Sequence, residues 1–224
     1  MRNRRVLALV LALLVAFAMM PAMGFADETT TDVVISPNPT TDTTTPAKSN
    51  DIVILGTSDV HCGIDQNIGY AGLAAYKKAM ADKYSYVALV DAGDAIQGDT
   101  IGTLSKGEYI VDIMNEVGYD VVTPGNHEFD YGMDQFLNVI VPKMKATYVS
   151  ANFMKDDKRV FDAYKIMTFG EKKVAFVGIS TPETLVKSTP TYFQDKYGNY
   201  IYDFCNDKTG DKLYKAVQSA VDAA

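Results

Sequence analysis

The sequence predicts a layered α/β fold, and three observations support it. Short apolar runs of strand length occur at 52–58, 86–90 and 119–124. Stripes of apolar residues at helical spacing separate these runs, and a hairpin pattern follows at 164–179. Strands that alternate with helices are typical of a sheet covered by helices, because each element must bury its apolar face against another. We therefore expect an α/β sandwich.

The first 26 residues are typical of a secretory signal peptide. Arginines at positions 2, 4 and 5 precede fifteen apolar residues at 6–20, and small residues follow Pro21 up to a cleavage site at 24–26. An uncleaved membrane anchor is the alternative, but the apolar run is short for a bilayer. We expect cleavage, no stable membrane insertion afterwards, and a secreted or extracytoplasmic location, at the cell surface or in the periplasm.

Residues 27–50 are rich in Thr, Pro and Asp and almost lack an apolar pattern, which indicates a solvated linker. A cell-wall spacer or a glycosylated stalk is the alternative. We expect the folded part to occupy residues 51–224.

The elements of the folded part follow from the hydrophobic period. In chain order we expect a strand at 52–58, a helix at 69–80, a strand at 86–90, a helix at 109–117 ended by Gly118, a strand at 119–124, a helix at 133–140 ended near Pro142, a strand at 147–150, a hairpin of 164–169 and 173–179, and a last helix at 213–221. The aromatic segment 191–207 has no regular period. We interpret it as a packed loop, with stacking on a base as the alternative.

The charge of the chain argues against partners that are polyanions. Removal of residues 1–26 takes away three arginines and leaves 18 basic against 28 acidic residues, a net charge of −10. Such a protein repels nucleic acid polymers and anionic membranes. A small phosphate ester can still bind where metal cations neutralise it.

Two cysteines, Cys62 and Cys205, lie 143 residues apart in a chain that we expect to be exported. They could form one disulfide, but they do not make a disulfide framework. Cys62 follows His61 directly, and we interpret it as a small buried residue, with a thiol near a metal as the alternative.

Polar side chains follow three successive predicted strands. Asp59 and His61 come after the first strand, Asp94 after the second, and Asn126 and His127 after the third. The intervals from Asp59 to Asp94 and from Asp94 to Asn126 are 35 and 32 residues, and each fits one strand, a crossover helix and the next strand. We expect three neighbouring parallel strands to bring these side chains to one edge of the sheet. Oxygen and imidazole ligands suit Mn, Fe, Zn, Co or Mg.

Three short motifs contain these residues: Asp59-x-His61, Gly93-Asp94-x-x-Gln97-Gly98, and GNHEFD at 125–130. Together they resemble the first three motifs of the calcineurin-like metallophosphoesterases. The continuation EFDYG and the sequence SAN at 150–152 are similar to the secreted 5′-nucleotidase branch. The resemblance runs from about Asp51 to the last residue. It implies an α-β-β-α sandwich with two mixed sheets, incomplete in this chain, which would hold the N-terminal part of the catalytic domain.

The resemblance also implies a site for two divalent metal ions. Asp59, His61 and Asp94 would hold one cation, and Asp94 with Asn126 would hold the other. His127 would contact the phosphoryl group and assist the leaving oxygen, with Asp130 holding its ring. In such enzymes two cations about 3.5 to 4 Å apart activate water and clamp the transferring group. On structural grounds alone, Asp59, Asn126 and His127 could instead cap turns.

We therefore expect an enzyme that hydrolyses phosphate esters, with extracellular 5′-nucleotides as its small-molecule substrates. A 2′,3′-cyclic nucleotide phosphodiesterase or a nucleotide-sugar hydrolase is a close alternative. An inactive, truncated surface protein is the alternative from another class.

His61 and His127 are the only histidines of the chain. The family completes its metal pair with imidazoles from later strands, and this branch usually adds a second domain that recognises the substrate. We therefore expect this chain to be a fragment that binds metal weakly and hydrolyses little by itself.

Overall fold

Four parallel strands form the central sheet, and they are neighbours in space in the same order as in the sequence. The computed structural model describes residues 47–224, so the predicted signal peptide and the linker up to residue 46 lie outside the described residues. The strands are β1 (Ser49–Thr57), β2 (Tyr84–Asp91), β3 (Val121–Val122) and β4 (Thr147–Tyr148), in the order β1-β2-β3-β4. The first strand therefore begins just before the predicted start of the folded part.

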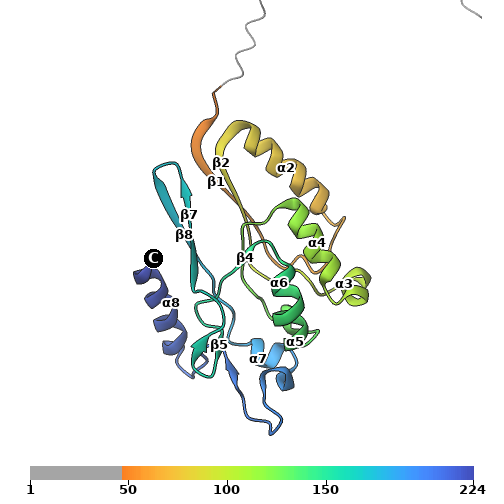
Figure 1. Ribbon diagram of the computed structural model, residues 1–224, viewed down its shortest axis with the longest axis vertical. Helices are drawn as coiled ribbons and strands as arrows, with labels where there is room; N and C mark the ends of the chain where they lie inside the picture. The colour runs from red at the N-terminus through yellow and green to blue at the C-terminus, as the bar shows by residue number, and fades with distance from the viewer. Residues whose placement is uncertain (1–46) are drawn as a thin grey trace, which may run out of the picture. The chain divides into compact units, whose positions relative to one another are not determined.

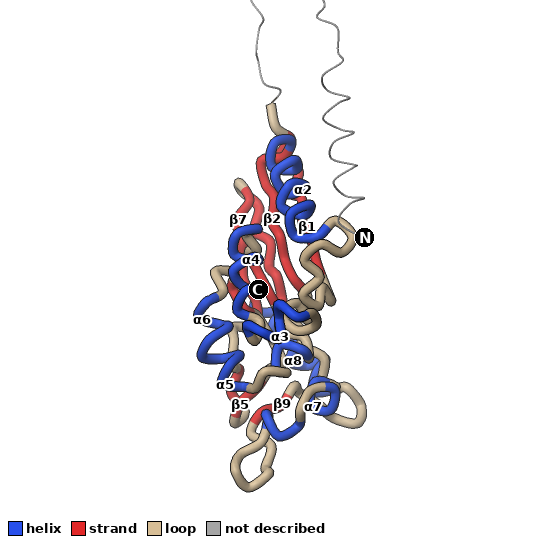
Figure 2. The backbone as a smooth tube through the Cα atoms, turned by 90° about the vertical axis from the view of Figure 1, so that its right-hand side faces the viewer, coloured by secondary structure: helices blue, strands red, loops and turns tan. Residues whose placement is uncertain are grey.

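Helices connect the parallel strands across one face of the sheet. Helix α2 (Gly69–Lys83) joins β1 to β2, while α3 (Thr100–Ser105) and α4 (Glu108–Val117) join β2 to β3. Figure 2 shows α2 and α4 in front of the strands. Gly118, with φ 81°, ends α4 as expected. The predicted units of strand, crossover helix and parallel strand are thus confirmed. A separate finding is that no helix among residues 47–224 is long and apolar enough to cross a bilayer.

The strand register aligns the carboxyl ends of the first three strands. Thr57 of β1 pairs with Asp91 of β2, and Asp91 pairs in turn with Val122 of β3. The loops that carry the three sequence motifs therefore leave the sheet at one common edge. This is the edge at which open parallel sheets place their ligands.

A single helical segment at 133–143 contains a wide turn. It consists of α5 (Met133–Gln135), the π-helical η2 (Phe136–Ile140) and α6 (Val141–Lys143). Pro142 has no N–H, and its ring would meet the carbonyl of residue 138 in a regular α-helix. The π turn just before Pro142 relieves this conflict, so the helix runs one residue past the predicted stop.

A second layer lies against the other face of the sheet. The hairpin of β7 (Tyr164–Phe169) and β8 (Lys172–Val177) forms as predicted, and the ring of Phe169 lies 6.1 Å from that of Tyr86 on β2. Helix α8 (Asp211–Ala223) covers the hairpin, and the Tyr164 hydroxyl donates to the carbonyl of Ala223 at 2.9 Å. Figure 1 shows the sequence of layers: α2 and α4, the parallel sheet, the hairpin, and α8. The structure has the expected α-β-β-α order of layers, but the expectation of two mixed sheets is wrong for the described residues, because the central sheet is entirely parallel and the second layer is an antiparallel hairpin.

Aromatic side chains fill the core at the end of the molecule that carries the site. The segment 184–204 contributes α7 (Thr184–Lys187), the 3₁₀ turn η3 (Pro190–Phe193) and β9 (Tyr202–Asp203). The last of these pairs with β5 (Met154–Lys155), which also pairs with β6 (Lys158–Arg159). Phe193, Tyr202 and Phe204 are buried, which confirms the packed-loop interpretation for these three rings, whereas Tyr192, Tyr197 and Tyr200 are exposed.

Candidate metal and catalytic site

The loops after β1 and β2 adopt left-handed backbone conformations that bring them side by side. Asp59, His61 and Asp94 have φ values of 54°, 47° and 59°, and Gly93 has 100°. The amide of Asp59 donates to the carbonyl of Gly93 at 3.0 Å, and the amide of His61 donates to that of Asp94 at 2.9 Å. Left-handed conformations are unfavourable for residues with a Cβ and persist where their surroundings hold them, often at functional sites. These two loops therefore form one fixed platform.

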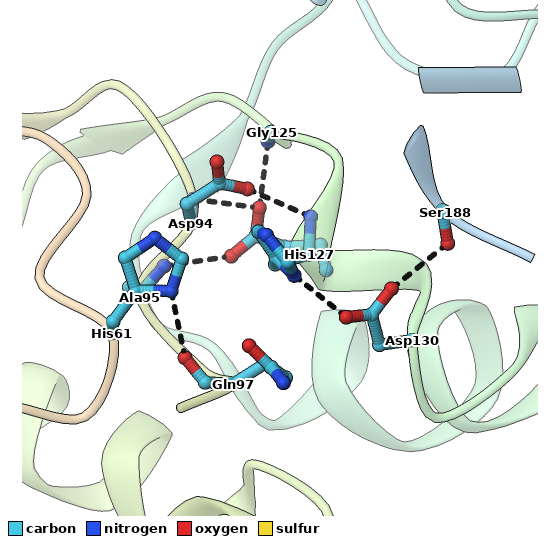
Figure 3. A network of polar contacts seen from close by, with 9 residues as sticks. His61, Asp94, Ala95, Gln97, Gly125, His127, Asp130 and Ser188 are labelled. Atoms are coloured by element: carbon cyan, nitrogen blue, oxygen red, sulfur yellow. Dashed lines mark hydrogen bonds and ion pairs between the residues drawn. The ribbon is translucent and has the colours of Figure 1, made fainter. Parts of the chain in front are cut away.

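Three side chains converge on this platform. The donor atoms of His61, Asp94 and His127 all lie within 4.8 Å of one another. The two imidazole rings meet edge to face, with their centroids 4.8 Å apart (Figure 3). Asp94 Oδ1 also accepts the amide of His127 at 2.7 Å, which ties the loop after β3 to the loop after β2. One carboxylate and two imidazoles form a donor set that suits a divalent transition metal.

The hydrogen bonds of both histidines leave Nε2 available. His61 Nδ1 lies 3.1 Å from the carbonyl oxygen of Gln97, and His127 Nδ1 lies 2.6 Å from Asp130 Oδ2. A carbonyl and an ionised carboxylate can only accept, so Nδ1 carries the proton in each ring. Histidines that bind metals commonly donate their second nitrogen to such an acceptor. The Gln97 carbonyl and the Asp130 carboxylate thus hold the two imidazoles in the way that is common for metal-binding histidines.

The other two expected ligands, Asp59 and Asn126, lie on the loops after β1 and β3 and are not part of this group of three. Asp59 is exposed, does not join the group of three, and accepts the hydroxyl of Ser58. It lines a cavity of about 380 Å³ at the carboxyl end of β1, together with Gln66 and Asn67. Asn126 is only 9% exposed and precedes the turn η1 (His127–Phe129), but its side chain makes no capping hydrogen bond there. Capping therefore does not explain why an asparagine occupies this position.

Glu128 organises the site, although the sequence alone gave no specific role for it. Its side chain is 3% exposed and accepts three backbone amides: those of Asp94 at 2.9 Å, Ala95 at 3.0 Å and Gly125 at 2.6 Å. Burial raises the pKa of this carboxyl, and the amide donors act in the opposite direction. Because these donors come from the loops after β2 and β3, Glu128 holds Asp94 and His127 in place relative to each other.

Asp91 performs the same task one strand earlier. It is 5% exposed and accepts the Thr57 hydroxyl at 2.5 Å and the Gly93 amide at 2.9 Å. Thr57 Oγ1 also lies 3.0 Å from the hydroxyl of Tyr119. Burial raises the pKa of Asp91 to about 7, and the Thr57 hydrogen bond opposes this rise. Asp91 thus links the ends of β1 and β2 next to the loops that carry His61 and Asp94.

The two cysteines are free thiols, so the possible disulfide is not formed. Cys62 is 1% exposed, and its Sγ lies so close to Gly102 that a Cβ on that glycine would approach it to 2.3 Å. Burial raises the pKa of the Cys62 thiol. The interpretation of Cys62 as a small buried packing residue is therefore confirmed.

Comparisons with known proteins identify the family of the chain. The profile of a family described as calcineurin-like phosphoesterase matches residues 52–218. A snake venom 5′-nucleotidase from Gloydius brevicauda is 32% identical over 163 residues, which cover 64% of this chain and 28% of the venom protein. The chain thus spans about a quarter to a third of the length of this relative.

Two solved structures share the fold. The 5′-nucleotidase precursor from Thermus thermophilus superposes with a TM-score of 0.61 at 21% identity, over 77% of this chain and 35% of that one. The NAD nucleotidase from Haemophilus influenzae gives a TM-score of 0.59 at 25% identity, over 75% of this chain and 32% of that one. Since the family profile covers most of the chain and the fold agrees, the chain belongs to the calcineurin-like phosphoesterase family.

Proposed function

We propose that this chain is the metal-binding, N-terminal part of the catalytic domain of a phosphoester hydrolase that releases phosphate from extracellular 5′-nucleotides. The convergence of His61 and Asp94, two of the proposed ligands, with His127 beside them is the observation that supports this proposal most directly. Similarity to a 5′-nucleotidase supports the substrate class. Residues 1–26 would direct the protein out of the cytoplasm as a signal peptide.

Four side chains would hold two divalent cations. In the proposed assignment His61, Asp94 and Asp59 serve one position, and Asp94 and Asn126 serve the other. Bound there, divalent cations would supply an activated water and neutralise the phosphoryl oxygens. Asp94 suits the shared position because it lies between the loops after β1 and β3 and is bonded to the amide of His127.

His127 would act as the general acid for the leaving oxygen. Its Nδ1 is held by Asp130, so the ring keeps one orientation and a proton on Nε2 can be delivered in one direction. A nucleoside alkoxide is a poor leaving group, and protonation of its oxygen removes most of that difficulty. Asp130 thus orients the imidazole.

A hydrolase of nucleoside diphosphate compounds is a second candidate, supported by the likeness to the NAD nucleotidase. In such substrates the phosphorus that is attacked carries a further ester substituent, and the bond that breaks is a diphosphate bond with a phosphate monoester as the leaving group. A 2′,3′-cyclic nucleotide is the third substrate to compare.

The test uses protein expressed from its complete reading frame, so that any flanking sequence is present. We expect Mn²⁺-dependent phosphate release from AMP to exceed release from a 2′,3′-cyclic nucleotide, a nucleotide sugar and NAD. We expect His127→Ala to lower turnover about 10²- to 10⁴-fold, in line with general acid catalysis. Asp94→Asn should abolish the Mn²⁺-dependent release of phosphate. Asp134→Asn removes an exposed carboxylate and serves as the control, with phosphate release as in the wild type.

Two results would contradict the proposal. If both His127→Ala and Asp94→Asn retain full activity, the reaction takes place elsewhere in the protein. No hydrolysis of any of the four substrates, combined with no binding of divalent metal by calorimetry, would favour an inactive surface protein.

A further inference from the structure

The carboxylate that holds His127 is itself held from a distant part of the chain. Ser188, 58 residues further along, donates its hydroxyl to Asp130 Oδ1 at 2.9 Å. The other oxygen, Oδ2, accepts His127 Nδ1 at 2.6 Å. Figure 3 shows Ser188, Asp130 and His127 in one continuous line of contacts. Each oxygen of Asp130 therefore has one dedicated donor.

The second donor matters because a carboxylate bonded at one oxygen alone can turn. The terminal torsion of an aspartate side chain has broad minima, so a single hydrogen bond leaves the plane of the carboxylate poorly defined. A donor at Oδ1 fixes this plane and points Oδ2 at the imidazole. Side chains that orient a catalytic histidine need such support to hold the productive geometry.

The backbone around Ser188 is anchored independently of its hydroxyl. The Ser188 amide closes the last turn of α7 by donating to the carbonyl of the fully buried Thr184 at 3.1 Å. Five residues later, Phe193 is buried, and its ring centroid lies 5.2 Å from that of Phe129, which follows His127 by two positions. The segment is thus docked on the His127 turn by packing, so loss of the hydroxyl alone should not release it.

We propose that Ser188 is a positioning residue for proton transfer by His127, and that it acts by fixing the carboxylate of Asp130. The inference rests on the proposed function, in which His127 protonates the leaving oxygen. It adds a third member to the His127–Asp130 pair, from a loop outside the three sequence motifs.

A comparison of leaving groups tests this role. Release of a nucleoside from AMP requires a proton, whereas release of p-nitrophenolate from p-nitrophenyl phosphate does not. We expect Ser188→Ala to lower kcat for AMP about ten- to a hundredfold with little change in KM. A catalytic group that is displaced by about 1 Å can lower the rate by about that factor. The same variant should retain kcat for p-nitrophenyl phosphate to within about threefold.

Two matched variants accompany it. Ser188→Thr keeps the hydroxyl, and the extended backbone of Ser188 (φ −94°, ψ −162°) accepts a β-branched residue, so AMP turnover should be rescued. Thr189→Ala removes the neighbouring hydroxyl, which has no hydrogen bond among the described residues, and should behave as the wild type.

A second measurement does not depend on turnover. In a ¹⁵N-detected imidazole spectrum of the metal-free protein, the variants His61→Ala and His127→Ala identify the signals of these two rings, whatever other histidines the flanking sequence adds. We expect Ser188→Ala to shift or broaden the His127 ring signals and to leave those of His61 in place. Thr189→Ala should change neither ring, and Ser188→Thr should restore the wild-type spectrum.

The outcomes separate the two ideas. The positioning role is wrong if His127→Ala retains kcat for p-nitrophenyl phosphate while Ser188→Ala lowers kcat equally for both substrates, or for neither. The proposed function fails if the wild type hydrolyses neither ester, or if His127→Ala lowers kcat for both esters alike. The imidazole spectrum alone then decides whether Ser188 holds Asp130 against His127. An unchanged His127 signal in Ser188→Ala would overturn the inference in that case.

Discussion

The buried carboxylate of Asp91 makes the stability of the metal-free protein depend on pH. Its pKa is raised from the usual 3.8 to about 7 by burial, so the folded state binds a proton that the unfolded state releases. The proton on Asp91 therefore contributes fully to the free energy of unfolding below about pH 4, and this contribution is lost as the pH rises towards 7. We expect the free energy of unfolding of the wild type, relative to Asp91→Asn, to fall by about 1.4 kcal/mol per pH unit across this window.

Urea denaturation at half-unit intervals from pH 4.5 to 7.5 measures this difference. Asparagine has nearly the same shape as aspartate and retains one acceptor for Thr57 or Gly93, so the fold should survive the change. Asp65→Asn removes an exposed carboxylate and controls for the loss of one surface charge. Parallel stability curves for the wild type and Asp91→Asn would contradict the prediction.

For single residues, the sequence predicted which candidate site residues lie together better than it predicted the residues that hold them in place. His61 and Asp94 fall together as expected, and His127 joins them. The specific contacts of Glu128 and Ser188 were not predicted, because their partners are backbone amides and a side chain far away in the sequence. A single sequence shows hydrophobic period and motif spacing, but it does not show which buried carboxylate faces which amide.

Among the elements, the sequence predicted order and direction well and length less well. The three leading strands are parallel neighbours, as the motif spacing indicated. Strand β3 contains only Val121–Val122, whereas the apolar run 119–124 predicted six residues. Pro124 lacks a donor for the ladder, and the chain turns after it to deliver the motif at 125–130. Strand length depends on where the neighbouring strand turns away, which hydrophobicity does not encode.

The close approach of the loops after β2 and β3 predicts a strong effect at Gly93. A Cβ there would lie 2.3 Å from the amide nitrogen of Gly125, and the residue has φ 100°. Gly198 has a similar φ of 86° but nothing within 4 Å of the added carbon, so Gly198→Ala isolates the cost of the backbone conformation. We expect Gly198→Ala to lose about 1–2 kcal/mol of unfolding free energy and Gly93→Ala clearly more, with weaker metal binding.

Urea denaturation and calorimetric titration with Mn²⁺ distinguish the two contributions. Equal losses of stability in Gly93→Ala and Gly198→Ala would show that backbone conformation alone matters. Unchanged metal affinity in Gly93→Ala would show that the approach of the two loops is not required for the site.

For the whole molecule, the alternation of elements predicted the layers, and the structure confirms them. The sequence did not predict which aromatic rings would meet. Phe129 lies two residues after His127 and is fully buried. Its ring contacts four others from separate segments, those of Phe136, Phe153, Phe193 and Phe204, with centroid distances of 5.0, 5.2, 5.2 and 5.6 Å. Contacts so distant in sequence have no signature in a local hydrophobic period.

This cluster links the candidate site to the stability of the fold, because Phe129 belongs both to the His127 turn and to the core. Phe129→Ala would open a cavity among the four rings, and we expect it to lower the free energy of unfolding by about 3–5 kcal/mol. Tyr197→Ala removes a ring that is 76% exposed, and we expect it to change the free energy of unfolding by less than about 0.5 kcal/mol. Urea denaturation of the three proteins gives both values. A loss below about 1 kcal/mol in Phe129→Ala would mean that the core closes around the cavity. In that case the His127 turn would be held by the hydrogen bonds of Glu128 and Ser188 rather than by aromatic packing.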